Sequence, residues 1–303
     1  MSRDCNRARE SGGRRRAAQA AGPRSHRPTF RSAALKAKVT GRAKKFFLLV
    51  ILAACEVSQE DEVAVGAETA RQIEAQLPVV GDPFIVAYMR ELGDTIAGRT
   101  SRADLDWHFY VVNSHQINAF ALPGGYIYIN RGLIEATTRV DELAGVLGHE
   151  IGHVIQRHSV QQMQDRQKLG VVAGLACTLT NICESGLGQA AIDIGGSALI
   201  ARYSRGDEFA ADSEAVANVL RVGIDPEGIP SLFEKLMRAR QVTPGTVEGW
   251  FATHPLEEAR IDNARRLIAQ AGAEGAGGLL QQLPSYVEFK RRVSALPEPA
   301  QPP

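Results

Sequence analysis

A stripe of apolar residues at intervals of three or four predicts a helix that begins near residue 83. Asp82 is a suitable cap for this helix, and Pro83 suits its first position, where an amide hydrogen would have no helical partner. A more polar helix is predicted before it, over residues 61–77. The stripe consists of Ile85, Met89, Leu92 and Ile96.

Two segments have the character of strands. They are residues 107–112 and residues 126–130, and the second, YIYIN, alternates with period two. This second segment follows a turn formed by Pro123, Gly124 and Gly125. Two helices and a pair of strands are therefore predicted ahead of residue 141.

Helices are predicted for most of the remaining chain. One runs from about Asp141 to beyond His158, and others cover residues 207–222, residues 226–240 and the segment that starts at Pro255. The buried face of the first consists of Leu143, Val146, Leu147, Val154 and Ile155. These elements predict a helix-rich α+β fold.

Two segments depart from this regular pattern. Residues 169–201 are rich in glycine, alanine and small apolar residues, and we expect a mobile helical hairpin that could act as a lid. No apolar run there approaches the roughly 20 residues of a membrane-spanning helix. From residue 273 onward glycine, glutamine and proline are frequent, so residues 273–303 are expected to form a flexible C-terminal tail.

The first 54 residues have the pattern of an export signal. Residues 1–45 hold 14 arginines and lysines against two acidic residues, and residues 46–54 form the short apolar run FFLLVILAA. The ending LAAC resembles the bacterial lipoprotein box, in which the cysteine, here Cys55, is lipidated and becomes the mature N-terminus. Residues 1–54 are thus predicted to be a leader and signal peptide, and residues 55–272 a folded domain tethered to a membrane.

The basic leader is longer than a typical signal. A translation start at Val39 would leave a signal of ordinary length, whereas the alternative is a real basic arm followed by a buried strand over residues 46–54. We favour export because of the lipoprotein box. By resemblance to lipoprotein sorting signals, Glu56 favours the outer membrane and a periplasmic domain.

Cys177 and Cys183 would be the only cysteines in the chain after removal of the leader and lipidation of Cys55. In an oxidising compartment they could close a short disulfide loop. Two small buried thiols are an equally good interpretation, and the spacing does not choose between them.

The charge of the whole chain is balanced, with 35 basic and 34 acidic residues and a net charge of +1. This balance gives no electrostatic reason to expect nucleic acid as a partner.

The strongest chemical signal is an HExxH motif inside a predicted helix, formed by His149, Glu150 and His153. Histidines four residues apart lie on one helix face, so both imidazoles can bind one zinc ion, while Glu150 can act as general base on a water activated by the metal. The alternative is a surface helix with two solvated histidines. Apolar or glycine neighbours on both sides of the motif argue against that alternative.

A catalytic zinc ion requires a third protein ligand. Glu208 is the candidate, and Asp212, four residues later on the same predicted helix face, could hydrogen-bond a ligand histidine from behind. The alternative for this pair is a solvated acidic face. His158 follows His153 by five residues and is predicted to face away from the site.

Four blocks of sequence resemble one known family, the zinc metallopeptidases related to HtpX, BepA and the CAAX prenyl endopeptidases. The blocks are INAFALPGGYIYINRGLI, DELAGVLGHEIGHVIQRH, RGDEFAAD and HPLEEARI, and they occur in the family's order between residues 117 and 262. The resemblance implies a zincin-like (gluzincin) fold with one zinc ion per chain, the ligands His149, His153 and Glu208, and Glu150 as the base.

The resemblance also implies where substrate binds. The YIYIN strand would form a sheet edge to which an extended peptide adds, bordered by a cleft that contains Asn118, Gly124, Gly125, Tyr126 and Tyr128. His254 matches the family's His-Pro position and could approach the metal or stabilise a tetrahedral oxyanion. A histidine that simply starts a helix before Pro255 is an equally good interpretation.

Together these observations predict a membrane-tethered zinc endopeptidase that acts on misfolded or misassembled cell-envelope proteins. The main alternative is a largely non-proteolytic chaperone or binding protein in envelope assembly. Hydrolysis of a non-peptide bond, such as a cell-wall amide, is less favoured because an edge strand suits a peptide.

Overall fold

The computed structural model describes residues 57–166, 202–242, 245, 247–255, 258–275 and 277–299, and the structural statements below concern these residues. The predicted leader with Cys55, the pair Cys177 and Cys183, and the predicted 169–201 hairpin lie outside them. Among the helices that are described, none combines the length and the apolar character needed to span a membrane.

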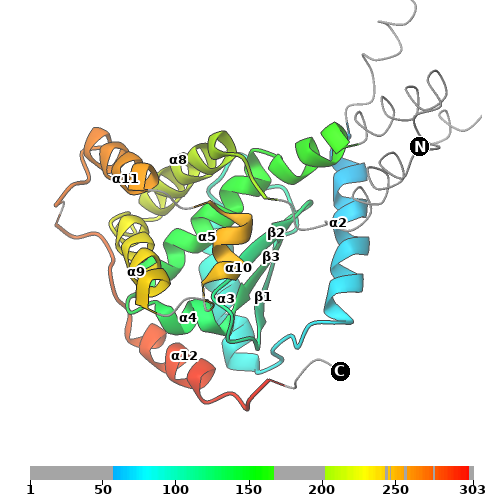
Figure 1. Ribbon diagram of the computed structural model, residues 1–303, viewed down its shortest axis with the longest axis horizontal. Helices are drawn as coiled ribbons and strands as arrows, with labels where there is room; N and C mark the ends of the chain where they lie inside the picture. Colours follow the sequence, from blue (N-terminus) through cyan, green and yellow to red (C-terminus); the bar gives the residue numbers. More distant parts are fainter. Residues whose placement is uncertain are drawn as a thin grey trace, which may run out of the picture. The chain divides into compact units, whose positions relative to one another are not determined.

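The fold is α+β and rich in helices, which confirms the predicted class (Figure 1). In chain order the elements are α2 (Gln59–Glu74), α3 (Pro83–Ala97), β1 (His108–Val112), β2 (Ala119–Leu122), β3 (Tyr126–Asn130), α4 (Arg131–Ala136), α5 (Val140–Ile155), α8 (Arg205–Arg221), α9 (Gly228–Val242), α10 (Glu248–Thr253), α11 (Glu258–Gln270) and α12 (Pro284–Ser294).

The cap and stripe predicted for α3 are present. The Asp82 carboxylate accepts hydrogen bonds from the backbone amides of Phe84 and Ile85, as an N-cap should. Every member of the predicted apolar stripe is buried in the main core.

Three strands form one sheet in the order β1-β3-β2. β1 runs parallel to β3, and β2 runs antiparallel to it. The sequence did not predict β2, because all four of its residues are buried and its text, AFAL, shows no alternation. The prediction that the YIYIN strand, β3, forms an edge is wrong, because β3 is paired on both sides, and β1 and β2 are the edge strands among the described residues.

The two faces of the sheet pack against different helices. Phe120, Leu122 and Tyr128 cluster with Ala70 of α2 on one face. The alternate residues of β2 and β3 join the main core, where β2 contacts α5 and β1 contacts α3. Figure 1 shows α2 on the opposite side of the sheet from α5.

The helix that carries the HExxH motif is shorter than predicted. α5 ends at Ile155, and a second helical segment covers residues 158–166. Between them Arg157 has φ = 56°, a left-handed conformation that is unusual for a residue with a side chain. Its guanidinium holds it in place, because it donates to the Glu62 carboxylate at 2.8 Å and to the Val57 carbonyl at 2.5 Å.

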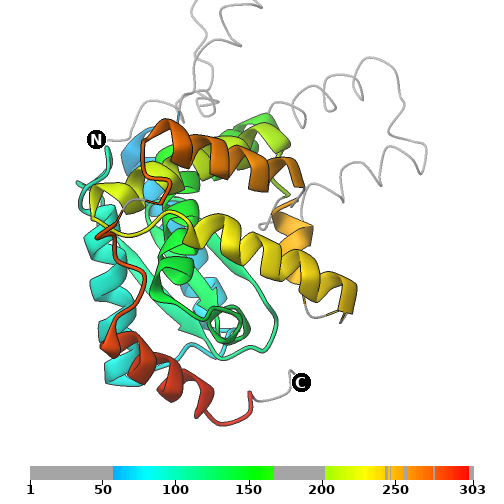
Figure 2. The ribbon, with the colours of Figure 1, turned by 90° about the vertical axis from the view of Figure 1, so that its left-hand side faces the viewer.

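The C-terminal residues do not all form a flexible tail. α12 lies within the segment predicted to be flexible, and its Tyr286, Phe289 and Val293 are fully buried. These residues follow a helical spacing, and Phe289 stacks on Tyr88 of α3 at 4.3 Å between ring centroids. Figure 2 shows α12 beside α3. The prediction was wrong here because the composition of the whole tail concealed a short amphipathic helix.

Candidate metal centre

The centre is built where α5 and α8 pack closely together. A Cβ atom on Gly152 would lie 2.9 Å from the Ala211 carbonyl oxygen, and one on Gly148 would lie 3.3 Å from the Ala215 Cα. Glycine on α5 and alanine on α8 therefore allow backbone contact that larger side chains would prevent. This contact brings the HExxH motif of α5 next to Glu208 of α8.

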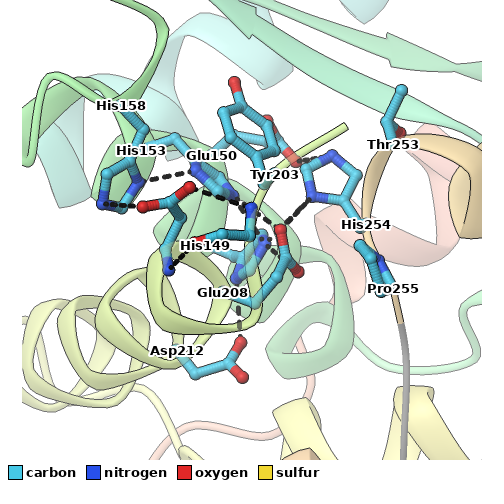
Figure 3. A network of polar contacts seen from close by, with 12 residues as sticks. His149, Glu150, His153, His158, Tyr203, Glu208, Asp212, Thr253, His254 and Pro255 are labelled. Carbon is cyan, nitrogen blue, oxygen red and sulfur yellow. Dashed lines mark hydrogen bonds and ion pairs between the residues drawn. The ribbon is translucent and has the colours of Figure 1, made fainter. Parts of the chain in front are cut away.

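Four side chains converge there, as Figure 3 shows. The Nε2 atoms of His149 and His153 are 3.1 Å apart, and a Glu208 carboxylate oxygen lies 3.4 Å from His153 Nε2. His254, at the C-terminal end of α10, places Nδ1 3.1 Å from the same oxygen. Potential ligand atoms of these four residues all lie within 4.8 Å of one another, and all four side chains are buried. The structure thus brings together the three predicted ligands and adds His254 to them.

The residues fit a metal ion. Imidazole nitrogens and a carboxylate are the donor types that zinc accepts, and one cation could bind the lone pairs of both Nε2 atoms at once. Within the described part of the chain, both carboxylate oxygens of Glu150 and the Nε2 of His254 are also buried without a hydrogen-bond partner. Such unpaired polar atoms are costly, and here they border the space in which a water molecule and a substrate would react.

Asp212 supports the cluster from behind. Its Oδ1 lies 2.9 Å from His149 Nδ1, so the position predicted for this carboxylate is the one it occupies. Burial would raise the pKa of Asp212, but Arg260 and His149 outweigh burial and lower it. The carboxylate is therefore charged and can hold the His149 ring in the orientation that directs Nε2 to the cluster.

Arg260 of α11 was not singled out from the sequence, although it lies in the HPLEEARI block. Its guanidinium donates two hydrogen bonds to Asp212, at 2.6 and 2.7 Å, and another to Glu208. Burial would raise the pKa of Glu208, but His254, His153 and Arg260 together lower it. One buried arginine thus compensates two buried carboxylates.

Glu150 is the third buried carboxylate of the centre, and no arginine among the described residues pairs with it. Its Oε1 lies 3.5 Å from His254 Nε2. Burial raises its pKa, and the nearby imidazoles reduce that effect only in part. A carboxylate with a raised pKa and free oxygens is suited to accept and return a proton.

His254 belongs to the site and is not merely a histidine at a helix start. Its ring stacks on Trp250 at 4.5 Å between centroids, while its two nitrogens face Glu208 and Glu150. Burial would lower the pKa of His254, but these two carboxylates outweigh burial and raise it.

Two neighbours of His153 were missed by sequence reasoning. Tyr203 stacks on its ring at 3.7 Å between centroids, and nothing in the sequence marks that tyrosine. The prediction that His158 faces away is wrong, because His158 Nδ1 lies 2.9 Å from His153 Nδ1. The error came from assuming a continuous helix through Arg157.

A pocket opens beside the centre, between the edge strand β2 and the residues 158–166 helix. It is lined by Val65, Thr69, Phe120, Ala121, Leu122, Pro123, Ser159, Gln162, Met163, Arg166, Tyr203, Thr253 and His254. The five predicted cleft residues, Asn118, Gly124, Gly125, Tyr126 and Tyr128, are not among them. Tyr128 is instead fully buried beneath α2, where its hydroxyl donates to Glu74 at 3.0 Å.

The fold and the centre define a class of protein: a helix-rich α+β domain in which an HExxH helix supplies two histidines and a glutamate to a buried metal-binding cluster. Residues 86–268 match the sequence model of a protein family that is described as "Peptidase family M48". The chain belongs to this family, which confirms the resemblance seen in its sequence.

Several proteins are similar to this chain in sequence. The chain is 32% identical over 224 residues to the beta-barrel assembly-enhancing protease of Yersinia pestis, covering 72% of this chain and 46% of that protein. It is 31% identical over 163 residues to the metalloprotease YcaL of Escherichia coli K12, covering 54% and 62%. It is 26% identical over 184 residues to the mitochondrial metalloendopeptidase OMA1 of Schizosaccharomyces pombe, covering 61% and 53%. The match thus spans about half the length of these relatives.

Removing Arg260 should destabilise the metal-free protein strongly. Arg260→Leu leaves Glu208 and Asp212 buried without their cation, and the loss of such a partner costs about 3–5 kcal/mol of unfolding free energy. Arg265→Leu on the same helix is the matched control. Arg265 forms a half-exposed ion pair with Glu234, so its removal should change the unfolding free energy little. Urea unfolding at pH 7 measures both.

The pH dependence of the unfolding free energy provides a second test of the role of Arg260. Asp212 and Glu208 have lowered pKa values in the wild type, so their stabilisation is present above about pH 4, the ordinary carboxyl range, and is lost below it. The stability difference between wild type and Arg260→Leu should therefore shrink as the pH falls below about 4. A difference that is small at pH 7, or that grows on acidification, would contradict this account.

Proposed function

We propose that this chain is a zinc-dependent endopeptidase that hydrolyses peptide bonds with a water molecule as the nucleophile. The observation that carries the proposal is the Glu150 carboxylate, which is buried beside the cluster of His149, His153 and Glu208 and has no hydrogen-bond partner among the described residues. A structural metal site would require no such free carboxylate next to it. Membership in a peptidase family supports the same activity.

His149, His153 and Glu208 would hold the zinc ion. When bound, zinc acts as a Lewis acid that makes water more acidic and polarises a substrate carbonyl. Glu150 accepts a proton from the attacking water and delivers it to the leaving amine as the peptide bond breaks.

His254 is suited to assist at the reacting carbonyl. Its buried Nε2 has no hydrogen-bond partner in the part of the chain that the structure describes and lies 3.5 Å from Glu150 Oε1, so it borders the same space as the base. A hydrogen bond from this nitrogen would stabilise negative charge as it develops on the substrate oxygen.

The edge strand β2 is the proposed guide for an extended substrate. β2 pairs with β3 along one side, and three of its four residues, Phe120, Ala121 and Leu122, line the pocket that also contains His254. A peptide added along the other side of β2 would run past the centre. The apolar lining from β2, Val65 and Met163 would favour apolar substrate side chains.

We further propose that the substrates are misfolded or misassembled proteins of the cell envelope and that Cys55 is lipidated and tethers the domain on the periplasmic side. Support comes from the export pattern of residues 1–55 and from the name of a relative, the beta-barrel assembly-enhancing protease of Yersinia pestis. An unfolded protein offers the extended segments that strand addition requires.

The catalytic assignment predicts different losses for two glutamates. Glu150→Gln should lower the kcat for a reduced and alkylated protein substrate by at least about 100-fold, because general-base catalysis is lost, while about one zinc per chain remains bound. Glu208→Ala should lose most of the zinc as well as the activity. Elemental analysis and peptide release measure the two effects.

Glu214→Ala is the matched control for these variants. Glu214 lies on α8 but is paired with Gln156 at the surface, so zinc content and activity should be unchanged. If Glu150→Gln cleaved the substrate as fast as wild type, the peptidase proposal would fail. If it lost cleavage but preserved the cellular role of the protein, the chaperone alternative would be favoured.

Strand addition predicts a period of two in the substrate. Methylating one backbone nitrogen of a peptide removes a hydrogen-bond donor, and alternate donors of an added strand point to and away from β2. A scan of N-methylated peptides should therefore alternate between little change and about a 2- to 10-fold loss of kcat/KM, from about 0.5–1.5 kcal/mol per bond. Equal losses at all positions would contradict pairing with β2.

The membrane anchor is tested by Cys55→Ser. This variant should incorporate no labelled fatty acid and should leave the membrane fraction of cells, because a thiol is needed for lipidation. Cys5→Ser, in the predicted leader, is the control and should behave as wild type. Continued membrane association of Cys55→Ser would contradict a lipid anchor at this residue.

A further inference from the structure

The two ligand histidines have the same arrangement around the cluster. Each ring directs Nε2 into it, and each has Nδ1 on the far side, close to a polar atom of another residue. His149 Nδ1 lies 2.9 Å from Asp212 Oδ1, and His153 Nδ1 lies 2.9 Å from His158 Nδ1. Asp212 is a familiar kind of partner for a metal-ligating histidine, whereas His158 has no role in the proposed reaction.

His158 is connected in turn to α8. It is 4% exposed, and its Nε2 lies 3.7 Å from Asp207 Oδ1. Asp207 is held by the N-terminal capping box of α8, in which the Ser204 amide donates to Asp207 Oδ2 at 2.9 Å. Each ligand histidine is therefore linked to a carboxylate of α8 on the side away from the cluster. Asp212 lies next to His149, whereas Asp207 is linked to His153 by way of His158.

The break after α5 makes this contact possible. In a continuous helix a residue five positions along is rotated by about 140°, so His158 would point away from His153. The left-handed conformation of Arg157 redirects the chain, and the buried Glu62 carboxylate stabilises that conformation by pairing with Arg157 at 2.8 Å.

We propose that His158 is a positioning residue for the metal site. The His153 Nδ1–H donates to His158 Nδ1, which leaves the lone pair of His153 Nε2 available to the metal. The second ring nitrogen of His158 then carries its hydrogen toward Asp207. Tyr203 stacks on the face of the His153 ring and so restricts the orientation of the same ring. This inference rests on the proposed zinc site but concerns metal affinity, which is measurable without substrate.

The alternative is that His158 only fills space between the residues 158–166 helix and α8. A pair of variants separates the two roles. The side-chain oxygen of asparagine can take the place of Nδ1 and accept the hydrogen bond from His153, whereas leucine fills the volume without an acceptor. If His158 only fills space, the leucine variant should retain zinc affinity better than the asparagine variant. If His158 positions His153, the asparagine variant should retain it better.

The experiment is zinc titration of the full chain against a competing chelator, with Zn²⁺ as the only probe. His158→Leu should weaken zinc affinity about 10- to 100-fold, the range found when the partner of a ligand histidine is removed. His158→Asn should retain affinity within about 3-fold of wild type. His115→Leu, at a half-exposed histidine outside the site, is the control and should bind as wild type.

Two results would overturn the proposal: wild-type affinity in folded His158→Leu, or equal weakening in the Asn and Leu variants. Thermal unfolding of the metal-free variants shows whether each is folded. If His158→Leu does not fold, His158→Gln replaces it, because the glutamine amide matches Nε2 and should lose affinity that asparagine retains. If the wild type binds zinc but cleaves no peptide, the proposed function is refuted. The zinc affinities of the His158 variants still test the positioning role, because they are measured without substrate.

Discussion

The site depends on how closely α5 and α8 approach each other. Gly148 and Gly152 of α5 face Ala215 and Ala211 of α8, and any larger side chain would force the helices apart. Because the ligand residues lie one position or one turn from these contacts, the backbone distance fixes the reach of His149, His153 and Glu208 toward one point. The close packing of α5 against α8 therefore also fixes the geometry of the metal centre.

The same packing creates an electrostatic problem that several elements resolve together. Glu150, Glu208 and Asp212 are all fully buried, and unpaired charges in such a place would be strongly destabilising. Arg260 of α11 compensates two of them, and His254 of α10 approaches the third. A divalent cation would complete the compensation, so metal binding and folding are expected to be coupled in this family of sites.

Glu62 plays an analogous organising role on the other side of the site. This buried carboxylate of α2 accepts hydrogen bonds from Arg102, Arg157 and the Gly124 amide. It thereby joins the first described helix, the break after α5 and the turn that ends β2. The position of His158 and the position of the edge strand are consequently set by one ion-pair network.

The sequence alone determined the local features of this protein. The period of the apolar stripe predicted α3, and the HExxH spacing put two imidazoles on one helix face. The spacing of Glu208 and Asp212 made them candidates for the third ligand and its supporting carboxylate, and the family resemblance favoured this choice over a solvated acidic face. These predictions succeeded because helical geometry relates residues within one or two turns. Tertiary structure decided the rest: that β2 and not β3 is an edge strand, that α12 is packed, that Arg260 joins the site and that His158 turns toward His153. Each of these depends on contacts between segments far apart in the chain, such as Glu62 with Arg157, and periodicity within one segment carries no information about them.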